Sequence, residues 1–373
     1  MTVSTRIGRR LLCTAIAALT VGSLAACATV EAPAASTVVP SPATSTASPS
    51  TDSTAAPLAD PRTLLGSSTA AAVSSITPIE SDVSPSLPVT VTDETGTSVT
   101  ITDTSRIIAL DLYGTLADTV VGLGLGDSLV GRGSTNTSAE MADLPVVTQD
   151  GHQLNGEAVL ALEPTVVLTD TSIGPREVQD QLRASGVAVV FFASTRTMDS
   201  VAVQITAVAE ALGVEEAGEE LATRSVQEIA DAQSEIAEMT DGIDPLRIAF
   251  LYVRGNGSVF FILGEGSGAD DLITSIGGND VATAAGISGT KPANSEALLA
   301  LNPELILVMS SGLESTGGLE GLLGRPGVSD TIAGQNRRIV DMNDGQVLSF
   351  GPSTGAVLHS LAAAVYAPTE LRP

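Results

Sequence analysis

Short apolar runs alternate with amphipathic stretches from about residue 88 to the end of the 373-residue chain. Runs rich in aliphatic residues predict buried strands, and helix-like stretches between them predict parallel sheets. The predicted strands are residues 107–112, 166–169, 187–192, 247–253, 259–263 and 305–309. This alternation is typical of the α/β class.

A fourteen-residue segment occurs twice in this region, at 155–168 and 294–307, with eight identical positions. In each copy an Asn can cap a helix, apolar residues cover one face, and a Pro ends the helix before a strand. Each copy lies within its own series of strands and helices. The repeat therefore predicts two similar lobes rather than one large sheet.

Between the two lobes the pattern predicts helices and no strand. Asp199 can cap a first helix that ends at Gly213, with apolar residues every three or four positions. A second helix is predicted from about residue 215 to 239, with apolar positions at Ala222, Val226, Ile229 and Ile236. At 1.5 Å per residue it is roughly 36 Å long, enough to cross both lobes. The predicted fold is α/β, with two Rossmann-like lobes of mostly parallel sheet joined by one long α-helix.

The amino terminus has the order of a secretory signal. Arg6, Arg9 and Arg10 precede an apolar stretch at 11–21, which is shorter than the roughly 20 residues that span a bilayer. The stretch leads into Leu-Ala-Ala-Cys at 24–27, which resembles the bacterial lipobox, whose cysteine receives diacylglycerol. We expect cleavage before Cys27 and lipid on Cys27. The alternative is an ordinary secreted protein whose cleavage site contains a cysteine.

Residues 28–87 are dominated by Ser, Thr, Ala and Pro, without a sustained apolar period. This composition predicts a flexible linker with an end-to-end distance on the order of 40 Å. The expected organisation is a signal peptide at 1–26, the lipidated cysteine and linker at 27–87, an N-terminal lobe at 88–198, a helical connector at 199–242 and a C-terminal lobe at 243–373.

Charge and cysteine content narrow the function. Removal of the signal takes three of the 17 basic residues and no acidic one, which leaves 14 against 43 and a formal charge of −29. Such an acidic chain is not expected to bind nucleic acid. Cys13 is lost with the signal and Cys27 is acylated, so the mature chain has no thiol for a disulfide or a metal. We find no catalytic motif, and the chain is not expected to be an enzyme.

Two α/β lobes joined by a long helix on a lipid tether resemble the substrate-binding component of ABC importers. The likeness is to the class III group, which handles haem, ferric siderophores and cobalamin, and it covers about residues 88 to 373. The opening hairpin pattern at 89–96 and the strand at 106–110 are similar to that family as well. The resemblance implies that Glu157 and Glu296 dock on arginines of a permease, which works with an ATPase in the cytoplasmic membrane. From the residues alone, both are first-turn acids that a helix dipole favours.

Open α/β lobes bind ligands beyond the carboxyl ends of their strands. One candidate ligand residue ends a predicted strand, and another follows the apolar run at 145–148. Tyr252 lies at the end of the first strand of the C-terminal lobe, and His152 precedes the capped helix of the N-terminal lobe. Tyrosine and histidine both ligate haem iron. Arg254 projects to the same side as Tyr252 and can favour the ionised phenol. Tyr-x-Arg, with a histidine a hundred residues earlier, resembles the HmuT-type haem-binding lipoproteins, which implies His152 and Tyr252 as axial ligands and Arg254 as support for the tyrosinate.

Other residues have weaker claims on a pocket. Tyr113 ends the first strand of the N-terminal lobe and is the main rival for the iron. Arg132 can pair with a propionate, and Phe350 can pack on the porphyrin or on the core. His359 lies in an apolar helical pattern and is expected to be packed or exposed.

The predicted function is capture of haem b, as Fe(III) haemin, at the outer face of the cytoplasmic membrane, from surface haem donors, for delivery to the permease. Two alternatives stay open. One keeps the fold and changes the cargo to a ferric siderophore or cobalamin. The other is a surface interaction or signalling lipoprotein without a small-molecule cargo.

Overall fold

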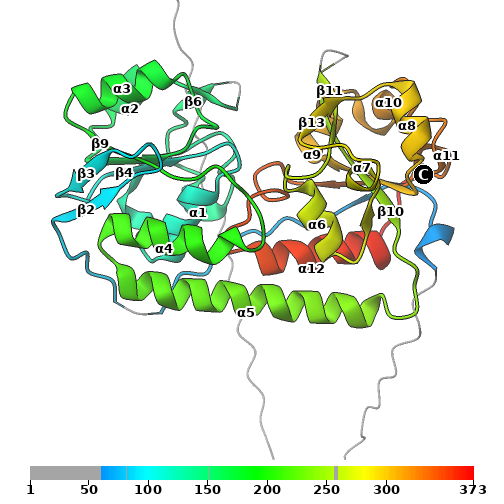
Figure 1. Cartoon of the computed structure of the whole chain (residues 1–373), viewed down its shortest axis with the longest axis horizontal. Helices are drawn as coiled ribbons and strands as arrows, with labels where there is room; N and C mark the ends of the chain where they lie inside the picture. Colours follow the sequence, from blue (N-terminus) through cyan, green and yellow to red (C-terminus); the bar gives the residue numbers. More distant parts are fainter. Residues whose placement is uncertain (1–59, 81, 150, 256–258) are drawn as a thin grey trace, which may run out of the picture. The chain divides into compact units, whose positions relative to one another are not determined.

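The computed structural model describes residues 60–80, 82–149, 151–255 and 259–373 (Figure 1). They belong to one unit, Ala56–Pro373. The predicted signal peptide, Cys27 and the linker as far as residue 59 lie outside the described residues. Among the residues described, no helix has both the length and the apolarity needed to cross a bilayer.

The N-terminal lobe contains a four-stranded parallel sheet in the order β5-β4-β8-β9. Its strands are β4 (Ile107–Leu110), β5 (Leu129–Gly131), β8 (Val166–Thr169) and β9 (Ala188–Phe191). Two small antiparallel pairs accompany it, β2 (Val89–Thr92) with β3 (Ser98–Ile101) and β6 (Thr148–Gln149) with β7 (Gln153–Leu154). The central strands β4 and β8 are buried along their whole length, as their unbroken apolar runs predict.

The C-terminal lobe contains a seven-stranded sheet in the order β1-β15-β14-β10-β11-β13, with β12 also paired to β10. Its strands are β1 (Ser68–Thr69), β10 (Arg247–Arg254), β11 (Val259–Leu263), β12 (Asn279–Asp280), β13 (Thr290–Pro292), β14 (Leu305–Met309) and β15 (Ile339–Met342). The prediction of mostly parallel sheets holds, except at β11 and β13. β11 is antiparallel to β10 and to β13; the connection between β10 and β11 is short and permits only a hairpin.

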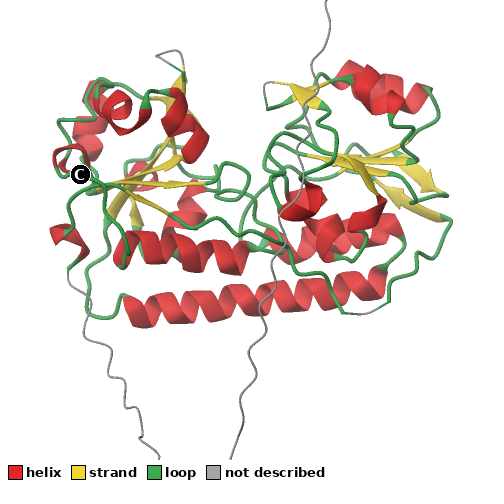
Figure 2. Cartoon of the chain, turned by 180° about the vertical axis from the view of Figure 1, so that it is seen from behind, coloured by secondary structure: helices red, strands yellow, loops and turns green. Residues whose placement is uncertain are grey.

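Helices cover the sheets and connect the lobes (Figure 2). They are α1 (Thr115–Gly122), α2 (Gly156–Ala161), α3 (Arg176–Ala184), α4 (Ser200–Leu212), α5 (Glu215–Met239), α6 (Ala269–Ser275), α7 (Val281–Ala284), α8 (Ser295–Leu301), α9 (Ser310–Ser315), α10 (Gly318–Leu323), α11 (Ile332–Gln335) and α12 (Thr354–Tyr366). Single 3₁₀ turns occur at η1 (Pro61–Thr63), η2 (Gly126–Ser128) and η3 (Ala139–Met141).

The long helix α5 is the predicted connector, and it packs on α4 of one lobe and on α12 of the other (Figure 1). Two glycines allow the backbones to approach. A Cβ on Gly218 would lie 2.3 Å from the Ala209 methyl of α4, and one on Gly355 of α12 would lie 2.7 Å from the Glu228 backbone of α5. One predicted core position is wrong, since Val226 points to solvent while Ser225 is buried. The buried stripe therefore runs one residue earlier at this turn.

The capping predictions have mixed outcomes. Asn155 and Asn294 cap α2 and α8 by accepting hydrogen bonds from the Ala158 and Ala297 amides. Gly213 ends α4 in the left-handed conformation, with a φ of 70°. Asp199 makes no capping hydrogen bond, because the Ser200 hydroxyl and its neighbours close that turn instead.

The predicted linker is too long at its carboxyl end. Residues 60–80 and 82–87, which we call the strap, are packed on both lobes. β1 adds to the edge of β15, and the Gln346 side chain bonds both backbone groups of Val73 at 3.0 and 2.6 Å. Further along, the Ile79 amide donates to Gly122 of α1, and the Ser86 amide donates to Gly213 after α4. The low-complexity composition of this segment does not predict its order, because the segment is held mainly by backbone hydrogen bonds and a few buried apolar side chains.

Replacing Ile79 by Ala should destabilise the protein by about 2–5 kcal/mol, because this side chain is buried in the main core cluster. Leu65 in the same strap is 64% exposed, so Leu65→Ala should change stability by less than about 0.5 kcal/mol. Chemical denaturation of both variants measures the difference. Equal stability of Ile79→Ala and wild type would show that the strap does not contribute to the fold.

Candidate functional site

Tyr252 and Arg254 lie at the carboxyl end of β10, on the same side of the strand. The Arg254 guanidinium carbon is 5.0 Å from the centroid of the Tyr252 ring, within cation–π range. Both side chains are half-buried, and Tyr252 packs against the main core cluster. The structure therefore brings together the tyrosine and the arginine that the sequence singles out.

Asp344 fixes this arginine. Its carboxylate forms an ion pair with the Arg254 Nη2 and accepts a hydrogen bond of 2.8 Å from the Ser311 amide in the first turn of α9. Arg254 also donates from Nη1 to its neighbour's carbonyl, Val253 O, at 3.2 Å. A guanidinium held at two positions keeps its place over the tyrosine ring, so Asp344 belongs to the site.

Tyr113 follows β4 and is also half-buried against the main cluster. Burial raises the pKa of the Tyr113 phenol above its ordinary value, while the Arg196 cation lowers it to a smaller extent. An ionised Tyr252 would raise it further, which places the two tyrosines within electrostatic range of each other. Tyr113 is thus a neutral neighbour of Tyr252 rather than a favourable phenolate.

Beneath Tyr113 lies a buried charge cluster of two acids and one arginine. Asp111 follows β4 and Asp170 follows β8, and both carboxylates face Arg196, at 3.4 Å and 2.8 Å from its Nη2. All three side chains are nearly inaccessible to solvent. Asp111 also accepts hydrogen bonds from the amides of Tyr113 and Leu116, which fixes the turn that carries the tyrosine.

Two carboxylates share one arginine in this cluster, and this arrangement changes the pKa of Asp170. Burial raises the pKa of Asp170 to about 6, with the charge of Asp111 as the second cause. Hydrogen bonds from Ser172 and the charge of Arg196 act in the opposite direction. Asp170 therefore titrates near the lower end of the physiological range.

His152 lies in the turn between β6 and β7, and it is exposed. Its backbone carbonyl accepts a hydrogen bond of 3.0 Å from Gly174, which ties the turn to the segment before α3. The turn thus has a defined anchor on the N-terminal lobe. The pairing of His152 with Tyr252 across one ligand stays a prediction.

The weaker pocket candidates are engaged elsewhere. Arg132 donates to the carbonyls of Leu144, Gly133 and Asn136, so its guanidinium holds its own loop together. Phe350 is buried in the main cluster beside Gly268. Of its two predicted roles, the structure shows the one in the core. Of the two states expected for His359, packed or exposed, the structure shows the exposed one, and its Nδ1 lies 3.1 Å from Glu235 of α5.

Glu157 and Glu296 occupy the first turns of α2 and α8, and both are exposed. The repeat therefore places them at equivalent, accessible positions on the two lobes. Both helices lie on the side of their lobe away from α5 (Figure 1).

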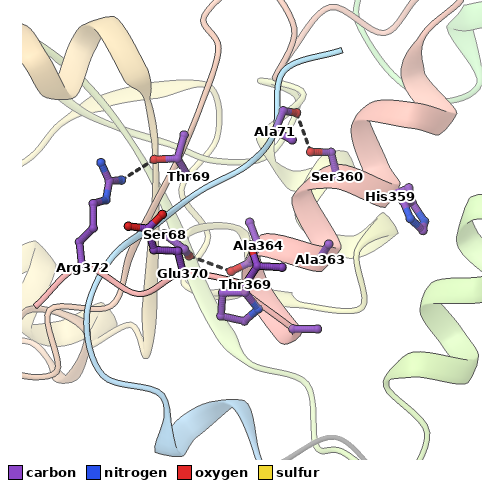
Figure 3. A pocket seen from close by; sticks show the side chains of 12 residues that line it. Ser68, Thr69, Ala71, His359, Ser360, Ala363, Ala364, Thr369, Glu370 and Arg372 are labelled. Carbon is purple, nitrogen blue, oxygen red and sulfur yellow. Dashed lines mark hydrogen bonds between the residues drawn. The ribbon is translucent and has the colours of Figure 1, made fainter. Parts of the chain in front are cut away.

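A cavity of about 450 Å³ lies between the strap and α12, and neither Tyr113 nor Tyr252 lines it. Figure 3 shows that it is bordered by hydrogen bonds within the chain, including Ser68 to Ala364 and Ser360 to Ala71. Arg372 also reaches Thr69 across it. These bonds join the strap to the carboxyl-terminal segment, so we assign the cavity a packing role and no ligand.

Sequence reasoning missed two sets of residues. Asp111 lies near the end of one predicted strand, 107–112, and Asp170 directly follows another, 166–169, so their meeting at one edge of the parallel sheet could have been predicted. Asp344 had no such signal, because the strand before it, β15, was not predicted.

The chain belongs to the periplasmic binding protein family, whose model matches residues 110–344. Proteins of this family that serve ABC importers work with a permease and an ATPase. Among curated protein sequences, none matches the chain.

Several solved structures resemble it closely. The haem-binding protein HmuT is 48% identical over 83% of this chain and 100% of its own, with a TM-score of 0.80. The periplasmic haem-binding protein RhuT from Roseiflexus sp. RS-1 is 36% identical over 71% of this chain and 98% of its own, with a TM-score of 0.65. BhuT, solved with two haems, is 30% identical over 70% of this chain and 98% of its own, with a TM-score of 0.62.

HmuT has been solved with one histidine, one tyrosine or one arginine replaced by alanine. In that chain the arginine follows the tyrosine by two residues, as Arg254 follows Tyr252 here, and the histidine precedes the tyrosine by 99 residues. His152 precedes Tyr252 by 100 residues.

Asp170→Asn should alter the pH dependence of stability. Because the folded-state pKa of Asp170 lies above the unfolded value, its contribution is full below about pH 4 and is lost as the pH rises through 6. A pKa difference of about two units corresponds to about 3 kcal/mol of unfolding free energy. Asparagine does not titrate, so the variant should lack this pH dependence, and loss of the ion pair with Arg196 should change its stability by the same amount at every pH. Unfolding free energies measured from pH 4 to 7.5 test this. The exposed Asp143→Asn serves as control, and a variant curve parallel to wild type would contradict the assignment.

Proposed function

We propose that the chain is an extracytoplasmic haem-binding protein that delivers haem to an ABC permease and its ATPase. The observation that carries this proposal is the pair of Tyr252 and Arg254, stacked 5.0 Å apart at the end of β10 and fixed by Asp344. The haem-binding relatives support it, as does the spacing in HmuT, where the tyrosine and arginine are two residues apart as here and the histidine–tyrosine spacing differs by one residue.

The chemistry of the pair suits a ferric porphyrin. A tyrosine phenol ordinarily ionises near pH 10, yet it binds Fe(III) as the phenolate. A cation beside the ring favours the ionised form, and Arg254 is held in that place by Asp344. Tyr113 is the less suitable ligand, because burial raises the pKa of its phenol. We assign Tyr113 to the wall of the pocket.

His152 is proposed as the second axial ligand, from the N-terminal lobe. It is exposed on a turn that a backbone hydrogen bond anchors to the N-terminal lobe. The haem would then be held between the lobes by one ligand from each. Arg132 and Phe350 are left with minor roles at most, since both side chains are already engaged.

The location and partners complete the proposal. Lipid on Cys27 would tether the protein to the outer face of the cytoplasmic membrane, where surface haem donors and the permease are accessible. Glu157 and Glu296 are proposed as the residues that dock on the permease, one from each lobe. A tether raises the effective concentration of the binding protein near its permease.

Ferric siderophores and cobalamin are the alternative cargoes within the same architecture. Competition of haemin against a panel of siderophores and cobalamin decides between them. Displacement of haemin by a siderophore at equal concentration would reassign the cargo.

Tyr252→Phe should weaken haemin binding by about tenfold or more, because it removes the phenolate ligand, and a tenfold change corresponds to about 1.4 kcal/mol. His152→Ala should alter the coordination, seen as a shift of the Soret band. Absorption titration of the purified protein with haemin measures both effects. Tyr113→Phe is the matched control. A changed spectrum in Tyr113→Phe together with an unchanged one in Tyr252→Phe would make Tyr113 the ligand.

Asp344→Ala should release Arg254 and so weaken the support of the tyrosinate. We expect the acid transition of the haemin complex, in which the tyrosine ligand is lost, to move to higher pH. Asp344→Asn keeps only one of the two acceptor oxygens that Arg254 and the Ser311 amide use, so it should restore the wild-type behaviour only in part. Spectral titration with acid measures the midpoint, with the exposed Asp330→Ala as control. The same midpoint in Asp344→Ala and wild type would exclude a positioning role.

A further inference from the structure

Two exposed leucines occupy the same position in the two copies of the internal repeat. Leu160 in α2 is 41% exposed and Leu299 in α8 is 48% exposed. They are two of six large apolar side chains found exposed among the residues that the structure describes. Exposed apolar side chains are ordinary when scattered singly, but a matched pair on equivalent helices is not scattered.

Neither leucine is needed for the packing of its helix. The inner face of α2 is covered by Val159, which is fully buried in the cluster of the N-terminal sheet. The inner face of α8 is covered by Leu298 and Leu301, which are buried in the cluster of the C-terminal sheet. The fold would therefore tolerate polar residues at Leu160 and Leu299.

Each leucine shares a helix face with a glutamate and an alanine. Glu157, Leu160 and Ala161 stand at positions i, i+3 and i+4, and all three are exposed. Their counterparts Glu296, Leu299 and Ala300 have the same spacing and are also exposed. Residues at this spacing are neighbours on a helix surface, so each lobe presents one carboxylate beside a small apolar patch. We call these two faces the α2 patch and the α8 patch.

We propose that the α2 and α8 patches, through Leu160 and Leu299, form the apolar part of the surface that docks on the permease. The inference rests on the proposed function for the identity of the partner. Two equivalent patches, one on each lobe, fit a partner that presents two equivalent surfaces, each with a cation beside apolar side chains. The glutamates supply charge, which mainly speeds and orients the encounter. The leucines supply buried area, which slows dissociation.

The test uses the mature protein and the permease–ATPase complex of the same cell, reconstituted in lipid nanodiscs. Binding is measured with and without haemin, together with the ATP hydrolysis that the binding protein stimulates. The double variant Leu160→Ser/Leu299→Ser should weaken binding by roughly tenfold for each leucine buried. Glu157→Gln/Glu296→Gln should chiefly slow association and lower the dependence on salt.

Val203→Ser is the matched control, since Val203 of α4 is 70% exposed and lies outside the repeat. It should bind the permease as the wild type does. An unchanged affinity of the double leucine variant, or an equal loss in Val203→Ser, would overturn the inference, and so would a wild-type protein that does not bind the permease.

A haemin titration of the same variants separates this inference from the proposed cargo. The leucine variants should bind haemin as tightly as wild type, because both side chains lie outside the ligand site. If wild type fails to bind haemin while the leucine variants still lose the permease, the docking surface stands and the cargo assignment fails.

Discussion

The packing of α5 against α4 and α12 is the constraint on which the rest of the structure depends. One helix of 25 residues buries a stripe that begins at Ala217 and ends at Ile236, and it serves both lobes at once. Gly218 near the start of α5 and Gly355 of α12, opposite Glu228 in the middle of α5, let the three helices approach closely. Close-packed interfaces transmit displacement rather than absorb it. Both lobes are therefore positioned by their packing on the same rigid helix, α5. Strand ends that carry the candidate ligand residues therefore keep their positions, as a preorganised site requires.

Three further connections between the lobes reinforce that constraint. The strap crosses from β15 to α1 and α4, and the loop at 343–350 lies against the N-terminal lobe, where Gly345 has no room for a side chain beside the Thr135 carbonyl. A third contact joins the Met198 amide to Asp271 at 2.6 Å. Asp344, which holds Arg254, belongs to this same loop. The loop at 343–350 thus both holds Arg254 beside Tyr252, through Asp344, and contacts the N-terminal lobe.

The sequence predicts most of this fold because its strongest signals are local. Unbroken apolar runs gave β8, β11 and β14 to the residue, and the period of α5 gave its full length. The strap was not predicted, because its strand has only two residues and pairs with residues about 270 positions away in the sequence. Asp344 was not predicted either, because its partner Arg254 lies 90 residues away in the sequence. At the site, Tyr252 and Arg254 were predictable because an i, i+2 relation in a strand is itself local. The relation between His152 and Tyr252 is not local, and no pattern within either segment fixes it.

The electrostatics of the site limit how an anionic ligand is recognised. Three arginines already have partners within the chain. Arg132 donates to carbonyls of its own loop, Arg196 pairs with Asp111 and Asp170, and Arg254 pairs with Asp344. A ferric porphyrin with two propionates approaches a chain whose formal charge is −26, so long-range repulsion opposes its capture. Affinity must then come from bonds to the iron and from apolar contact with the porphyrin face. In that setting the Arg254–Asp344 pair has a specific value, because it supplies a local cation at the phenol while remaining neutral as a pair at longer range.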